Sequence, residues 1–117
     1  MIFDEAVALG RSIGRHDDFQ ALRRAEKELA EATELKEKVD RLQQLGGRAE
    51  RQVVEGEQVS DETKRQYETL LAEVQADPRY QRWVAAQSNF EKLMLRVHEH
   101  IAEGMHDAAE SRIITLD

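Results

Sequence analysis

Apolar residues recur every three or four positions along almost the whole chain, which is the spacing of one face of an α-helix. Nowhere does the sequence sustain the alternation of apolar and polar residues that is typical of a β-strand. The pattern therefore predicts an all-α fold of about five amphipathic helices, arranged as an antiparallel bundle or as a hairpin with two long helices. We expect one helical domain over residues 1–117, with its core over about residues 2–106.

Two short helices are predicted at the start of the chain. The first spans about residues 2–14, where Gly14 is expected to end it in a left-handed conformation. Its apolar stripe consists of Ile2, Ala6, Leu9 and Ile13. Asp17 is expected to cap the second helix, with Gln20 completing a capping box. A bend is expected over residues 31–34, before a third and longer helix begins.

The third helix carries a narrow apolar seam. Its members are Leu35, Val39, Leu42, Leu45, Ala49 and Val53. Gly46 and Gly47 interrupt the seam, and each costs a helix about 1 kcal/mol relative to alanine. We interpret the pair as a bend or as a place where another helix approaches closely, and Gly56 as the residue that ends the helix.

Two clear start signals follow. Ser60 is expected to cap a fourth helix, and Asp77 with Pro78 is expected to open the last one. The last helix is predicted to run about 28 residues, or roughly 40 Å, which is longer than a domain of this size needs. Part of its apolar face is therefore expected to pack against a neighbouring chain. We expect a frayed, disordered tail over residues 107–117, with docking of the apolar tail residues Ile113, Ile114 and Leu116 as the alternative.

Charge and composition exclude several classes of function. The 24 Asp and Glu outnumber the 17 Lys and Arg, giving a net charge of −7, which disfavours direct binding to nucleic acid. The chain has no cysteine, which excludes disulfides, thiolate zinc sites and iron–sulfur clusters. There is neither a secretory leader nor a run of about 18 apolar residues, so we expect a cytoplasmic protein without a membrane span.

Two polar groupings offer alternatives to a purely structural chain. Glu99, Glu103 and His106 share one helical face, and Glu103 with His106 has the Glu-x-x-His spacing of carboxylate-bridged metal sites. Such sites need a second copy of the motif, so we favour a solvated face. Arg79 and Arg82 lie near an aromatic pair and are the candidate for direct RNA binding, although snorkelling around a buried Trp83 is favoured.

No arrangement typical of a nucleophile, a phosphate loop or a metalloprotease is present, so we expect no enzyme, no catalytic residue, no cofactor and no bound metal. The apolar faces of the long helices instead suggest contacts with other protein surfaces. The candidate interface consists of Leu42, Gly46, Ala49, Val53, Trp83, Phe90, Leu93, Val97 and Ile101.

The order of these features resembles the YlbF/YmcA family of small helical bacterial proteins, over about residues 3–106. The residues that carry the resemblance are Leu42, Gln43, Gly56, Val59, Glu62, Leu70, Asp77, Pro78, Tyr80, Ala86, Phe90, Leu93 and Ile101. Some members carry cysteines that bind iron–sulfur clusters, and this chain departs from them because it has none. It is also similar to the shorter, cysteine-free branch of the family.

The resemblance implies a cytoplasmic regulator without catalytic residues that forms a homo-oligomer or associates with paralogues. Better-studied members form a complex that acts on the endoribonuclease RNase Y, and thereby affect RNA processing, competence, sporulation and biofilm formation. A protein partner in RNA processing is therefore the expectation that the resemblance adds.

Overall fold

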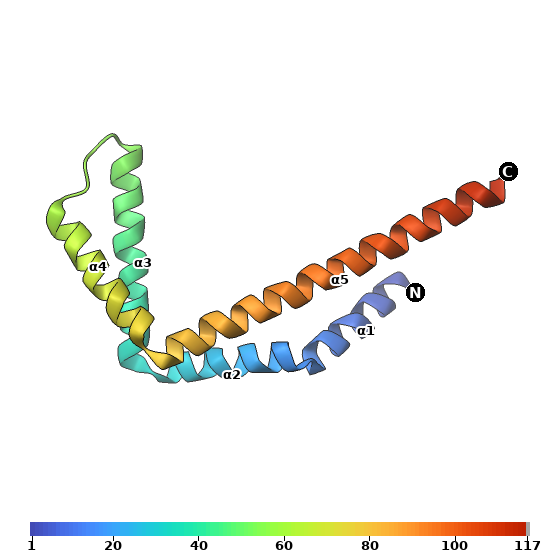
Figure 1. Ribbon diagram of the computed structural model, residues 1–117, viewed down its shortest axis with the longest axis horizontal. Coiled ribbons are helices and arrows are strands. Elements are labelled where there is room, and N and C mark those ends of the chain that lie inside the picture. The colour runs from blue at the N-terminus through green and yellow to red at the C-terminus, as the bar shows by residue number, and fades with distance from the viewer. Residues whose placement is uncertain (117) are drawn as a thin grey trace.

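The computed structural model describes residues 1–116, with side chains up to residue 111. It contains five helices, which confirms the all-α prediction, and no strand within residues 1–116 (Figure 1). The helices are α1 (Ile2–Arg15), α2 (Asp17–Glu31), α3 (Thr33–Val54), α4 (Asp61–Ala76) and α5 (Pro78–Leu116).

Three of the helix boundaries follow the expected local chemistry. Gly56 has a φ of +79°, and its N–H donates to the carbonyl of Val53 at 3.1 Å while Glu57 donates to Gln52 at 2.8 Å, which is a Schellman end for α3. The Ser60 hydroxyl accepts from the Thr63 N–H at 3.2 Å and caps α4. Asp77 caps α5, as the site geometry below shows.

The junction between α1 and α2 differs from the prediction. His16 is the N-cap of α2, since its Nδ1 accepts from the Asp18 N–H at 3.0 Å, and Asp17 is already the first helical residue. Gly14 lies inside α1 with an ordinary φ, because the helix ends one residue later at Arg15. The cap expected at Asp17 and the helix end expected at Gly14 are therefore wrong.

The chain forms one long helical hairpin that is bent once near its middle. Figure 1 shows α3 and α4 side by side as an antiparallel pair, which we call the hairpin arm. In the same view α2 runs antiparallel to the start of α5, and α1 continues α2 toward the far part of α5; these three helices form the long arm. The arms meet where Ala32 separates α2 from α3 and Asp77 separates α4 from α5, so the expected bend over residues 31–34 is confirmed.

Buried side chains are few and lie in two places. In and beside the hairpin arm, Leu35, Leu45 and Val74 are buried, and Lys38 bridges Glu34 of α3 and Glu73 of α4 at 3.6 and 3.5 Å. In the long arm, the buried residues are Leu22, Ala25 and Ala86. No charged or polar residue with a described side chain is buried. The molecule is therefore two thin packed layers joined at a corner.

This shape leaves an unusually large surface exposed. The radius of gyration is 21.5 Å, whereas a compact chain of this length has about 13 Å. The accessible surface is 9389 Å², against about 6,500 Å² for a compact protein of this mass. The chain thus exposes roughly 2,900 Å² more than a compact monomer would.

The last helix is longer than predicted. α5 spans 39 residues and continues as helix through Leu116, so the end expected near residue 105 is wrong. The possible disorder of residues 107–117 stays a prediction, and the docking of Ile113, Ile114 and Leu116 concerns side chains outside the described residues. Across residues 1–116, no helix is long and apolar enough to cross a membrane.

Candidate protein interface

Two aromatic residues of α5 pack within the long arm. Trp83 and Phe90 are half-buried and pack against the core formed by α2 and α5. The Phe90 ring lies 5.7 Å from that of Phe19 in a tilted arrangement, and the Trp83 ring lies 5.8 Å from that of Tyr80. These two members of the candidate interface therefore already have partners within the chain.

The arginines at the corner are engaged by carboxylates. Arg79 donates from Nε and Nη2 to the two Asp77 oxygens at 3.0 and 2.7 Å, and its backbone N–H donates to Oδ1 at 2.9 Å. Because Arg79 makes these bonds, the pKa of Asp77 falls to about 2. The same pairing raises the pKa of Arg79. Asp77 thus caps α5 and also forms an ion pair with Arg79, the first basic residue of that helix.

Arg82 forms the second ion pair, and this pair joins α5 to α2. Its Nε donates to Glu28 Oε2 at 3.3 Å, and its Nη2 donates to Oε1. The hydrogen bond lowers the pKa of Glu28 and raises that of Arg82. Both guanidinium groups are already paired with carboxylates and are therefore poorly placed to neutralise a phosphate. The geometry thus gives the RNA-binding alternative no support.

The seam of α3 faces α4 over most of its length. A Cβ added to Gly46 would lie 3.5 Å from Cε2 of Tyr67, an ordinary contact with a side chain of α4, and α3 passes through both glycines without a break. Ala49 lines a small hollow with Val59 and Tyr67. Val53, at the end of the seam, is 65% exposed. The candidate interface residues in α3 are therefore largely used to build the hairpin arm.

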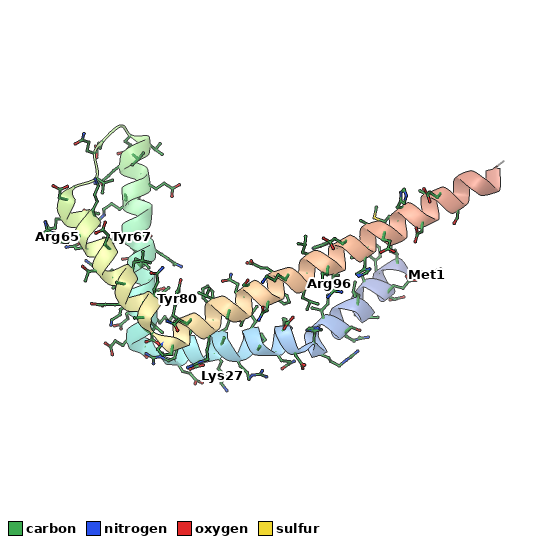
Figure 2. The ribbon with its side chains drawn as sticks, viewed as in Figure 1. Met1, Lys27, Arg65, Tyr67, Tyr80 and Arg96 are labelled. Carbon is green, nitrogen blue, oxygen red and sulfur yellow. The ribbon has the colours of Figure 1, made fainter. Side chains whose placement is uncertain are left out.

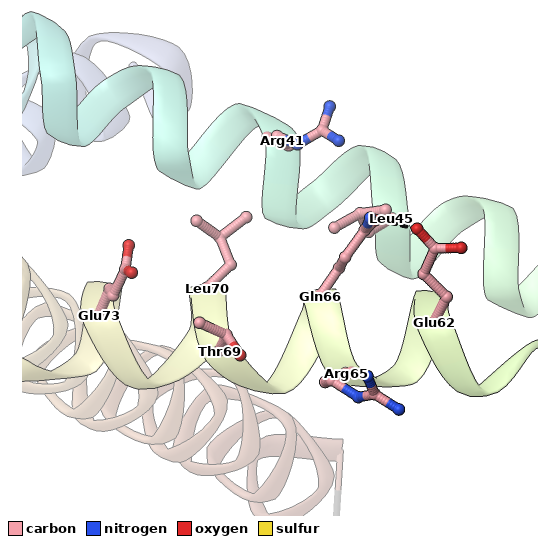
Figure 3. A pocket seen from close by; sticks show the side chains of 8 residues that line it. All are labelled: Arg41, Leu45, Glu62, Arg65, Gln66, Thr69, Leu70 and Glu73. Carbon is pink, nitrogen blue, oxygen red and sulfur yellow. Dashed lines mark hydrogen bonds between the residues drawn. The ribbon is translucent and has the colours of Figure 1, made fainter.

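A shallow groove lies between α3 and α4 and opens to solvent (Figure 3). It is lined by Arg41, Leu45, Glu62, Arg65, Gln66, Thr69, Leu70 and Glu73. Leu45 and Leu70 point into the gap between the helices, whereas Arg65 points away from α3. All four charged side chains are exposed. The groove therefore offers none of the buried, perturbed groups that a catalytic site needs.

A more apolar groove separates α1 from the distal part of α5. It has a volume of about 500 Å³ and is lined by Leu9, Leu93, Arg96, Val97, His100 and Ile101. Three of the predicted interface residues, Leu93, Val97 and Ile101, thus lie together here. We call α1 and residues 93–108 of α5 the free end of the long arm; Figure 2 labels Met1 and Arg96 in this region.

The histidines and carboxylates near the end of α5 form local pairs. His100 Nδ1 lies 3.3 Å from Glu103 Oε2, and His106 Nε2 lies 3.0 Å from Glu110 Oε1, all on the exposed surface. Among the described residues no three His, Asp or Glu side chains come together as a metal site. The metal alternative at Glu99, Glu103 and His106 therefore gains no support from this geometry.

The amino-acid sequence matches a known protein family over most of its length. The family described as "Control of competence regulator ComK, YlbF/YmcA" matches residues 2–106. The chain belongs to the YlbF/YmcA family. No curated protein and no solved structure gives a significant match. The match covers the hairpin arm, α1 and α2 completely and α5 up to residue 106.

The structure also brings out residues that the sequence reasoning did not include. Phe3 and Val7 of α1 are exposed, and they adjoin the predicted stripe of Ile2, Ala6, Leu9 and Ile13 around the helix. At about 100° per residue, the apolar and glycine positions of α1 other than Ala8 form one arc, which is the signal that could have identified them. As an interface, the nine predicted residues stay a prediction, now divided between two regions of the molecule.

Proposed function

We propose that this chain is a non-enzymatic regulatory protein that works as a homo-oligomer and acts by contacting other proteins. The observation that carries the proposal is the exposed surface of 9389 Å², well above the value of about 6,500 Å² for a compact monomer. Thin layers of helices with uncovered apolar faces are stabilised when another protein surface covers them. No group of residues described above assembles catalytic chemistry.

The family supplies the biological context of the proposal. Its description connects YlbF/YmcA proteins with control of the competence regulator ComK. We propose that this chain acts in the cytoplasm as an accessory factor of RNA processing, as the family's RNase Y regulators do. Since the chain contains no cysteine, an iron–sulfur cluster has no part in this role. The contacts would have to be made by the helical surface itself.

Light scattering after size exclusion tests the self-association. At micromolar concentration the proposal expects a mass of at least twice the 13.5 kDa of one chain. A folded, strictly monomeric protein over the whole concentration range would contradict the oligomer. Circular dichroism on the same fractions would show that the helices are intact.

A binding and cleavage assay tests the partner. Purified chain is added to the soluble part of RNase Y with a structured messenger RNA, and binding and cleavage sites are compared with and without the chain. The proposal expects a complex and a changed cleavage pattern, without cleavage by the chain alone. Absence of a complex at tens of micromolar would remove RNase Y as the direct partner.

A further inference from the structure

Most apolar residues of α1 lie on one side of the helix, but no other helix covers that side. At about 100° per residue, its apolar and glycine residues other than Ala8 occupy an arc of about 160°, and all its charged residues lie outside that arc. The members of the arc are Ile2, Phe3, Ala6, Val7, Leu9, Gly10, Ile13 and Gly14. An arc this wide normally faces a core. Yet no residue of α1 is buried, and Phe3 is 81% exposed.

The distal part of α5 repeats this situation. An arc of about 120° without any charged residue runs along it. Its members are Leu93, Met94, Val97, Ile101, Gly104, Met105 and Ala108. The first three are half-buried, whereas Ile101 is 45% exposed and Met105 more so. The apolar face of α5 thus loses its cover where α2 gives way to α1.

The two uncovered arcs border one groove and match in length. α1 has 14 residues, about 21 Å, and residues 93–108 of α5 span about 24 Å. Leu9 lines the groove from α1, and Leu93, Val97 and Ile101 line it from α5. α1 and distal α5 make no backbone contact with each other across this groove, so the apolar sides of both remain open to a second pair of helices, which could complete a four-helix bundle.

We infer that the free end of the long arm is where a second copy of this chain docks, with α1 and distal α5 of both copies forming a four-helix bundle. The inference rests on the self-association proposed above and assigns its surface. A two-fold axis would place α1 of one copy against α5 of the other, twice. The hairpin arms would then project from opposite ends of the dimer.

The exposed area favours a second copy as the occupant. A standard interface buries about 800 Å² on each partner, which is a fraction of the roughly 2,900 Å² that the whole chain, the free end included, exposes beyond a compact monomer. Gly10 has no atom within 4 Å of a Cβ built on it, so the apolar arc of α1 has room for a closely packed helix.

The distribution of charge also favours a second copy as the occupant. Each copy carries a net charge of −7, so any contact between copies must avoid bringing carboxylates together. The two arcs satisfy this condition because neither contains a charged residue. A membrane surface is a poorer fit, since the polar side of α1 carries Asp4 and Glu5 as well as Arg11 and Arg15 and is not the cationic face that binds anionic lipid.

The test introduces carboxylates at two positions that are already exposed in the single chain. Phe3→Asp with Ile101→Asp places four new charges in the proposed bundle of two chains, which should weaken self-association by at least about 100-fold. The matched control is Val53→Asp with Val54→Asp at the tip of the hairpin arm, where both valines are exposed. Val53 belongs to the other part of the candidate interface, so the control adds the same charge to the rival surface. Light scattering and circular dichroism are measured on all three proteins over a dilution series.

We expect a dimer for the wild type and the control, and a helical monomer of 13.5 kDa for Phe3→Asp with Ile101→Asp. A wild-type oligomer that persists in this variant, or that dissociates only in the hairpin control, overturns the surface but leaves the proposed function standing. A wild type that is monomeric at every concentration overturns both. Monomeric wild type that sediments with anionic vesicles overturns the second copy in favour of a membrane surface.

Discussion

The hairpin arm and the free end of the long arm are built from similar amphipathic helices, but they differ in what covers their apolar faces. In the hairpin arm, α3 and α4 cover each other, with Leu45 buried and Gly46 beside Tyr67. At the free end, α1 and distal α5 border a groove and leave Phe3 and Ile101 exposed.

This difference shows that an apolar stripe predicts that a helix packs against another surface, but does not predict which surface that is. Side chains buried within one chain stabilise it at any concentration. Side chains that are buried only on association stabilise the protein by mass action, so their contribution rises with concentration. The two regions should therefore respond differently to mutation and to dilution.

The largest expected effect is a loss of stability at the corner of the molecule, where a side chain is buried within a single chain. Leu35→Ala should lower the free energy of unfolding by about 2–5 kcal/mol, because Leu35 is almost completely buried and its loss leaves a cavity. Urea denaturation measures the loss, which should not change with protein concentration. Val54→Ala is the control, since Val54 is 82% exposed and its truncation should cost less than about 0.5 kcal/mol. A loss below 1 kcal/mol for Leu35→Ala would contradict the packing described for the corner.

A pair of glycine substitutions sharpens the comparison with a smaller effect. Gly47 and Gly10 both lie within helices and have open space around them in the single chain, so alanine at either position should stabilise its helix by up to about 1 kcal/mol. Gly47→Ala should leave self-association unchanged, whereas Gly10→Ala should weaken it, because only Gly10 lies in the proposed bundle. Thermal melts at low concentration and light scattering give the two readouts. Equal effects of both variants on association would count against close packing at α1.

The smallest expected effect concerns the ion pair that opens α5. The pKa of Asp77 is lowered from 3.8 to about 2 by its bonds to Arg79, so its stabilising contribution is complete above about pH 4 and is lost as the pH falls toward 2. Asp77→Asn should remove this part of the acid dependence. Melting temperatures of both proteins between pH 2 and 5 measure the difference, which should shrink toward the acid end. A constant difference across that range would show that the carboxylate charge is not the cause.

Much of the fold could be predicted because local chemistry sets it. Gly56, Ser60 and Asp77 act where their side chains or backbone preferences indicated, and the bend near Ala32 lies inside the expected segment. The cap at His16 was missed because a histidine ring nitrogen is an uncommon cap beside two aspartates. The length of α5 was underestimated because the residues beyond Met105 lack a strong apolar stripe.

The interface could be predicted only in part, for a geometric reason. The pattern showed that Leu42 of α3 and Val97 of α5 both lie on apolar faces, but not that α4 packs on α3 whereas a groove lies beside Val97. That choice depends on where the hairpin bends and how far α1 reaches along α5. The position of the bend and the reach of α1 both depend on contacts between distant parts of the chain, which cannot be inferred from the apolar stripe of a single helix.

The separation between labels on two copies tests the central claim most directly. The chain has no natural cysteine, so Arg96→Cys and Val54→Cys each carry one spin label, the first at the margin of the free end and the second at the hairpin tip. Electron paramagnetic resonance then measures the distance between the two labels of a dimer. A dimer joined through α1 and distal α5 predicts a short distance for residue 96 and a much longer one for residue 54, since the arms extend the molecule to 69 Å. Labels at residue 54 that lie closer together than those at residue 96 would contradict the account and assign self-association to the hairpin arm.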